Sequence, residues 1–106
     1  MAYGFEKVKN EAIRYADEAK RKLSAKKVYL YGSYAKGTAG KGSDVDICFF
    51  FDNIDGGQSQ IEIISKLIML GTKYDAFFEP NAMPTSELYN DNPFVKEIVQ
   101  TGVELI

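Results

Sequence analysis

The chain has 106 residues, and 45% of them are hydrophobic, so we expect one domain, residues 1–106, with a single core. It contains no histidine and one cysteine, which excludes histidine-based general-base catalysis, histidine-ligated zinc and an internal disulfide within this chain. The net charge is −2, and no hydrophobic run approaches the roughly 18 residues of a membrane span.

The first half of the chain predicts a helix, two strands and a short helical turn. Hydrophobic residues recur at three- and four-residue steps over 4–24, which is typical of an amphipathic helix. The β-branched and aromatic run at 27–31 predicts a strand that stops at Gly32, and Ser33 could then cap a short helical stretch. Residues 44–51, D-V-D-I-C-F-F-F, predict a second strand.

The middle of the chain predicts a helix followed by a third strand. After a turn at D-N-I-D-G-G, residues 59–72 carry a hydrophobic stripe that ends at Gly71. The run K-Y-D-A-F-F-E at 73–79 predicts a strand that Pro80 would stop.

The C-terminal part predicts two helices and a closing strand. Thr85 or Ser86 could cap a short helix, and residues 93–101 predict a longer one. Residues 103–106 predict a short strand. The whole order indicates an α/β (α+β) domain with a small mixed β-sheet flanked by helices.

The glycine-rich run A-K-G-T-A-G-K-G-S at 35–43 resembles a phosphate-binding P-loop, but it fails the pattern. Ala35 stands where the first glycine is needed, and Gly42 stands where a hydroxyl residue should bind Mg²⁺. The run also leads into a strand, whereas a P-loop opens a helix. A surface loop is the better interpretation.

Gly32 and Ser33 form a second candidate phosphate site. Glycine lets the backbone approach a ligand, and the serine hydroxyl with the first amides of a helix can bind phosphate oxygens. Lys36 lies about one turn further on and could neutralise phosphate charge. Gly-Ser at a strand end is also an ordinary turn, so this pattern is weak by itself.

Asp44 and Asp46 are the candidate metal ligands. On a strand, residues two apart point to the same face, and paired carboxylates beside a hydrophobic run are stabilised by a divalent cation. Oxygen ligands favour Mg²⁺, Mn²⁺ or Ca²⁺. The charge distribution fits, because residues 1–43 carry 10 Lys or Arg and 4 Asp or Glu, whereas residues 44–106 carry 3 and 11. A solvated basic helix face would give the same asymmetry, and Asp44 could simply cap the loop.

A third carboxylate would complete a two-metal site. Asp75 is the first candidate, because an aspartate is unusual inside the strand expected at 73–79. Glu79 shares the face of Asp75 and is the second candidate. Asp52 and Asp55 lie in a turn, where aspartate is common.

The pattern G-S-x10-D-V-D, with a carboxylate on a later strand, resembles the DNA polymerase β-like nucleotidyltransferase superfamily. Its size and element order are similar to the minimal nucleotidyltransferase (MNT) family, and the tail F-V-K-E-I-V-Q-T-G-V-E-L-I resembles that family's closing helix and strand. The resemblance implies that Gly32 and Ser33 bind a nucleoside triphosphate and that Asp44, Asp46 and Asp75 are the catalytic, metal-binding carboxylates. Two Mg²⁺ ions, or Mn²⁺, are implied as cofactors.

The resemblance further implies an enzyme that transfers NMP, with ATP as the expected donor of AMP, to a hydroxyl group. Lys36 departs from the family, which often has Arg there, so we expect a weaker phosphate grip. MNT proteins commonly act as antitoxins that adenylylate a HEPN-type partner, and the short chain fits an acceptor presented by another chain. The alternatives are a non-catalytic antitoxin and a small-molecule nucleotidyltransferase that works as a homodimer. We expect a cytoplasmic protein, with neither a membrane nor nucleic acid as partner.

Overall fold

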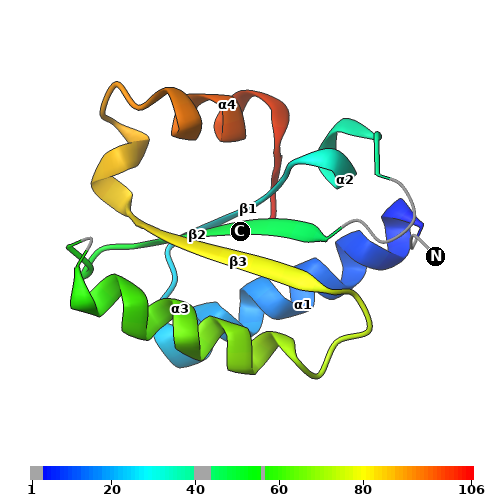
Figure 1. Ribbon diagram of the computed structural model, residues 1–106, viewed down its shortest axis with the longest axis horizontal. Helices are drawn as coiled ribbons and strands as arrows, with labels where there is room; N and C mark the ends of the chain where they lie inside the picture. Colours follow the sequence, from blue (N-terminus) through cyan, green and yellow to red (C-terminus); the bar gives the residue numbers. More distant parts are fainter. Residues whose placement is uncertain (1–3, 40–43, 56) are drawn as a thin grey trace.

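A mixed β-sheet lies at the centre of the molecule, with helices on both of its faces (Figure 1). The computed structural model describes residues 4–39, 44–55 and 57–106. Within these ranges, every helix is too short or too polar to cross a membrane. In chain order the elements are α1 (Phe5–Leu23), β1 (Lys27–Tyr31), α2 (Ser33–Lys36), β2 (Val45–Phe51), α3 (Gln58–Gly71), β3 (Phe78–Pro84), the 3-10 helix η1 (Thr85–Leu88), α4 (Pro93–Thr101) and β4 (Val103–Glu104).

The sheet has the strand order β3-β2-β1-β4. Strand β1 is antiparallel to β2 and to β4, whereas β2 is parallel to β3. The predicted fold class, a small mixed sheet flanked by helices, is therefore confirmed. Strand β2 lies inside the sheet, between β1 and β3, and β3 lies at one edge.

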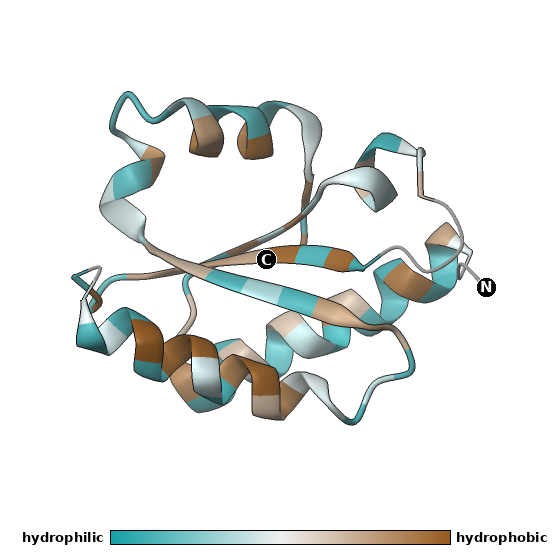
Figure 2. Ribbon diagram, in the orientation of Figure 1, coloured by the Kyte–Doolittle hydropathy of each residue, from teal (hydrophilic) through white to brown (hydrophobic). Residues whose placement is uncertain are grey.

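Helices α1 and α3 cover one face of the sheet, and α4 with η1 lies over the other (Figure 1). The odd-numbered side chains of β2 pack into the larger core with α1 and α3. Cys48 and Phe50 pack into a smaller cluster with Val95 and Ile98 of α4. Figure 2 shows the alternation of hydrophobic and hydrophilic residues at the N-terminal end of β2. Asp46 therefore lies on the α4 side of the sheet.

Helix α1 joins the sheet to α3 through one aromatic side chain. Tyr15 is completely buried, and its ring meets Phe49 of β2 edge-on at 5.0 Å between centroids. Its hydroxyl donates a 2.5 Å hydrogen bond to the Leu67 carbonyl of α3. The helices predicted at 4–24 and 59–72 are confirmed to within one residue at each end.

The strand expected at 73–79 is wrong in its bounds, because β3 runs over Phe78–Pro84 and residues 72–76 form turns and bends. Pro80 does not stop the strand. The Val45 amide donates to the Phe77 carbonyl at 2.9 Å, and the parallel register places the nitrogens of Pro80 and Pro84 on the side away from β2. Proline is tolerated at an edge position where no neighbour needs its N–H.

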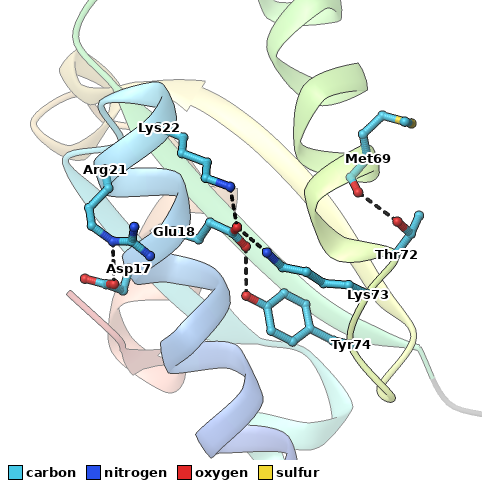
Figure 3. Close-up of polar contacts among 8 residues, drawn as sticks. All are labelled: Asp17, Glu18, Arg21, Lys22, Met69, Thr72, Lys73 and Tyr74. Atoms are coloured by element: carbon cyan, nitrogen blue, oxygen red, sulfur yellow. Dashed lines mark hydrogen bonds and ion pairs between the residues drawn. The ribbon is translucent and has the colours of Figure 1, made fainter.

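Two glutamates of α1 hold the loop that precedes β3. Glu11 is buried, and its carboxylate accepts hydrogen bonds from the backbone amides of Asp75 at 3.1 Å and Ala76 at 2.9 Å. Glu18 is also buried and accepts from Lys22, Lys73 and Tyr74 (Figure 3). The hydrogen bonds from the two lysines lower the pKa of Glu18 to about 2. The loop is thus fixed to a helix that lies far away in the sequence.

Helix α4 begins and ends as its sequence indicates. Pro93 occupies the first turn, the side chain of Asn92 accepts from the amides of Phe94 and Val95, and the Gly102 amide donates to the Ile98 carbonyl at 2.8 Å. The short closing strand follows directly as β4 and pairs with β1.

The short helix expected near Thr85 is present as η1, but its predicted cap is wrong. Neither Thr85 nor Ser86 caps it, because Pro84 occupies the capping position and no side chain bonds to the free amides. The Thr85 hydroxyl instead donates to Asp52 at 2.7 Å and ties η1 to the turn after β2.

Candidate functional site

Acidic side chains gather where β2 and β3 enter the sheet. Asp46 on β2 lies directly opposite Glu79 on β3, and Tyr31 is its partner on β1. Asp44 lies two residues before Asp46 and is exposed, as is Glu79, whereas Asp46 is half-buried. Burial raises the pKa of Asp46, and the negative charges of Glu79 and Asp44 raise it further. The site therefore concentrates negative charge that a bound cation would stabilise.

Gly32 lies against the carboxylate of Asp46. Its backbone has φ +75° and ψ −151°, a conformation that essentially only glycine adopts. A Cβ at this position would also lie 2.2 Å from Oδ2 of Asp46, so a side chain has no room. The turn after β1 thus packs bare backbone directly against the acidic group.

Ser33 is the first residue of α2. The expectation that Ser33 caps this helix is therefore wrong. Gly32 is the N-cap residue, because the chain already turns into the helix at Ser33, and no side chain caps α2. Lys36 is exposed, and its Nζ lies 3.6 Å from Oε1 of Glu97 on α4. Residues 40–43, which belong to the predicted glycine-rich surface loop, lie outside the described residues.

Asp75 does not lie in a strand, so the expectation that singled it out is wrong. It is an exposed residue of the 72–77 segment, and its carboxylate forms a 3.2 Å ion pair with Lys7 of α1. Glu79, the second candidate, is the carboxylate that the sheet register places opposite Asp46. Proline is tolerated in an edge strand, so the sequence also allowed a strand that continues through Pro80. Such a strand would have indicated Glu79 as a strand carboxylate.

Tyr31 and Asn81 also line the α4 side of the sheet, and no sequence pattern singled them out. The Tyr31 ring meets Phe94 of α4 edge-on at 5.7 Å. Burial, together with the charges of Cys48 and Asp46, raises the pKa of Tyr31 to about 12. The phenol is therefore neutral at physiological pH and presents an uncharged polar group next to Asp46.

Comparison with known families decides what kind of domain carries this site. A family model described as the nucleotidyltransferase domain matches residues 12–102, which is most of the chain. The chain belongs to this family. The match includes every candidate site residue named above, from Gly32 to Glu79. A search of curated proteins found no match.

Three solved structures illustrate the similarity in fold. The crystal structure of a "putative nucleotidyltransferase" from Sulfolobus solfataricus has a TM-score of 0.57 and 20% identity, and the alignment covers 98% of this chain and 89% of that one. A toxin-antitoxin structure with AMP-PNP has a TM-score of 0.56 and 22% identity over 92% of this chain and 72% of that one. A mutant of the toxin-antitoxin MntA-HpeT has a TM-score of 0.56 and 18% identity, covering 92% and 71%.

Nucleotidyltransferase domains generally use divalent metals, and the donor atoms of this site fit such ions. Asp44, Asp46 and Glu79 supply only oxygen atoms, which Mg²⁺ and Mn²⁺ prefer. Among residues 4–39, 44–55 and 57–106, no group of three or more acidic or thiol side chains forms a ready-made cage. Mg²⁺ is usually held by one or two carboxylates together with substrate phosphates, so an incomplete protein cage beside Gly32 suits a metal that arrives with a nucleotide.

Proposed function

We propose that this nucleotidyltransferase domain transfers AMP from ATP to a hydroxyl group of a partner protein, as the antitoxin of an MNT/HEPN-type pair. The observation that carries the proposal is the position of Asp46, which lies between Glu79 on the neighbouring strand and the bare backbone of Gly32. The similar folds of a toxin-antitoxin and of a toxin-antitoxin with AMP-PNP support the partner and the nucleotide.

The residues around Asp46 divide into two groups. Gly32, Ser33 and Lys36 follow β1 and would receive the triphosphate, with the lysine neutralising part of its charge. Asp44 and Asp46 would hold the divalent cations. When bound, these cations stabilise the negative charge on the reacting phosphate and on the departing pyrophosphate.

Glu79 takes the third-carboxylate role in this proposal, in place of Asp75. It is exposed, so it can meet an incoming hydroxyl, and it lies opposite Asp46 in the sheet. The acceptor oxygen bonds to the α-phosphorus of ATP, the bond from that phosphorus to the bridging oxygen breaks, and pyrophosphate leaves. The hydroxyl proton passes to the Glu79 carboxylate, because the chain has no histidine to accept it.

Labelled ATP tests this proposal directly. The chain is incubated with α-labelled ATP and Mg²⁺, with and without the product of the adjacent gene, and label on protein is measured. Label that appears only with the second protein supports the antitoxin enzyme. Tight binding of the second protein without label indicates a non-catalytic antitoxin, and label on a small molecule indicates a homodimeric enzyme.

Carboxylate-to-amide variants test the residue roles. Asp46→Asn and Glu79→Gln should each lower the transfer rate at least about 100-fold, whereas Asp75→Asn should keep most of it. Asp17→Asn is the matched control, because Asp17 is exposed on α1 and pairs with Arg21 on the same helix. Circular dichroism checks that each variant is folded. Full transfer activity of Asp46→Asn would contradict the proposal. Loss of transfer activity in Asp75→Asn but not in Glu79→Gln would identify Asp75 as the third carboxylate.

A further inference from the structure

Helix α3 is hydrophobic around most of its circumference, although it lies at the surface of the molecule. Seven of its 14 residues are isoleucine, leucine or methionine, yet only Leu67 is fully buried. Ile63, Ile64 and Leu70 pack partly against the larger core. Figure 2 shows hydrophobic bands along most of this helix. A helix that is hydrophobic on all sides is typical of one that is covered on all sides, and the folded chain covers α3 on one side only.

The uncovered side of α3 carries large hydrophobic residues. Ile61, Ile68 and Met69 are 60%, 51% and 73% exposed. Positions 61, 65 and 69 are four apart, so Ile61, Ser65 and Met69 form one ridge along the helix, and Ile68 lies next to it. The Ser65 hydroxyl donates to the Ile61 carbonyl at 3.1 Å, so it needs no partner outside the helix. We call these four residues the α3 surface.

One flank of the α3 surface carries two opposite charges. Glu62 and Lys66 are exposed and four residues apart, so they lie on the same flank. This flank faces the end of α1, because both residues line a pocket with Leu23 and Ser24. The opposite flank faces β3, to which the Gln60 side chain bonds. Within the part of the chain that the structure describes, neither Glu62 nor Lys66 forms an ion pair.

We propose that the α3 surface is a homodimer interface, on which a second copy of this chain packs its own α3 in the opposite direction. In a two-fold pair of such helices, the same flank of both copies lies on the same side of the interface. Glu62 of each copy then lies beside Lys66 of the other, so one charge pattern forms two ion pairs. The same axis places Ile61 beside Met69 of the other copy. Ser65 lies at the crossing point, where its small side chain lets the helices approach.

The size of the surface predicts a weak dimer. A helix of 14 residues is about 21 Å long, so one of its faces buries less than the roughly 800 Å² per partner of a standard stable interface. Interfaces of this size belong to transient complexes. We therefore expect a dimer Kd on the order of 10–100 µM, which corresponds to about 5–7 kcal/mol of binding free energy.

The homodimer leaves the candidate site open and does not depend on the proposed function. Asp46 lies on the α4 side of the sheet, whereas α3 covers the other face (Figure 1). The two copies of the candidate site would therefore face outward, away from the shared helices. Each would remain accessible to a nucleotide and to a further protein.

Sedimentation velocity on the full chain tests for the dimer. Between about 5 and 500 µM, the apparent mass should rise from that of a monomer toward that of a dimer, because dimerisation follows mass action. Ile61→Ser should raise the dimer Kd at least about tenfold. Ile13→Ser is the matched control and should leave the dimer Kd unchanged, because Ile13 is 40% exposed on α1 and lies beside Ile106 on a different surface.

A charge exchange tests the orientation of the two helices. Lys66→Glu places like charges opposite each other at two points of the dimer, so the dimer Kd should rise at least about tenfold at low salt. Adding Glu62→Lys to Lys66→Glu should restore the dimer Kd to within about threefold of its original value. Circular dichroism at low concentration checks that each variant is folded. In the ¹⁵N-labelled chain, the amides of 58–72 should shift with concentration.

Four outcomes would overturn the homodimer. They are a monomer at every concentration, equal weakening by Ile13→Ser and Ile61→Ser, a double charge variant that stays monomeric, and concentration-dependent shifts confined to α4. If the product of the adjacent gene shifts the α3 amides of a monomeric chain, the α3 surface binds a different protein and the homodimer is likewise wrong. None of these measurements uses a nucleotide, so their failure leaves the proposed transfer reaction intact. Loss of AMP transfer in a chain that still dimerises would contradict the proposed function alone.

Discussion

Replacement of Gly32 by alanine should damage both the fold and the site, and the structure allows the two effects to be separated. The φ of +75° with ψ −151° costs a non-glycine residue about 1–3 kcal/mol. The new Cβ would also lie 2.2 Å from Oδ2 of Asp46, so that carboxylate must move. Gly37 is a matched control, because it has the same φ of +75° with nothing within 4 Å of its Cβ position.

Urea unfolding of the two variants, with and without the Asp46 carboxylate, gives the size of the steric effect, because the two glycines also differ in ψ, −151° at Gly32 and 17° at Gly37. In Gly37→Ala only the left-handed backbone is strained, which costs about 1–2 kcal/mol. Both variants gain the same small stabilisation from a less flexible unfolded chain, so this contribution cancels in their difference. We expect Gly32→Ala to be the less stable by at least about 1 kcal/mol, and the difference to shrink in an Asp46→Ala background, where the clash is absent. The reasoning is refuted if the two alanine variants are equally stable, or if removing Asp46 leaves the difference unchanged.

Two further predictions concern charged contacts. The pKa of Glu18 is lowered from 4.5 to about 2 in the folded chain. The contribution of its ionised carboxylate to stability is therefore complete above pH 4.5 and is lost as the pH falls through 2. Glu18→Gln should flatten the fall of Tm across this window, whereas Asp17→Asn should not. In the proposed function Lys36 binds phosphate, and its ion pair with Glu97 would compete with that contact. Glu97→Gln should therefore tighten Mg-ATP binding about twofold at low salt and change the free energy of unfolding by less than about 0.5 kcal/mol. A weaker Kd for Mg-ATP in Glu97→Gln would instead show that the ion pair positions Lys36 for the nucleotide.

The elements that the sequence predicted well are those with local signals. Helix α1 has a continuous hydrophobic stripe, and α4 has a cap, a proline in its first turn and a glycine after its end. The predicted bounds of β3 were wrong because a strand tolerates Pro80 only where its nitrogen faces away from the neighbouring strand. The sheet register decides which way that nitrogen faces. No local pattern in the sequence contains that information.

In the candidate site, too, the sequence predicts local proximity but not proximity that depends on strand pairing. Asp46 lies on β2 and Asp44 directly precedes that strand, so their proximity follows from a separation of two residues in the sequence. The position of Glu79 opposite Asp46 required the parallel pairing of β2 with β3. Glu11 and Glu18 are polar residues of an amphipathic helix, yet both are buried. Their partners include the Asp75 and Ala76 amides and the Lys73 side chain, which lie more than 50 residues later in the sequence. A buried glutamate and an exposed one look alike in the hydrophobic pattern.

The edge of β3 has a consequence for how this domain can assemble. Pro80 and Pro84 have no N–H to offer, and the Ala82 amide between them donates to the side chain of its neighbour Asn81 at 2.9 Å. The Ala82 carbonyl is taken as well, because the side-chain amide of Gln60 donates to it. A strand from another molecule would therefore find its bonding partners missing or occupied along this edge. Strand-to-strand association with another molecule is therefore disfavoured at the β3 edge of the sheet.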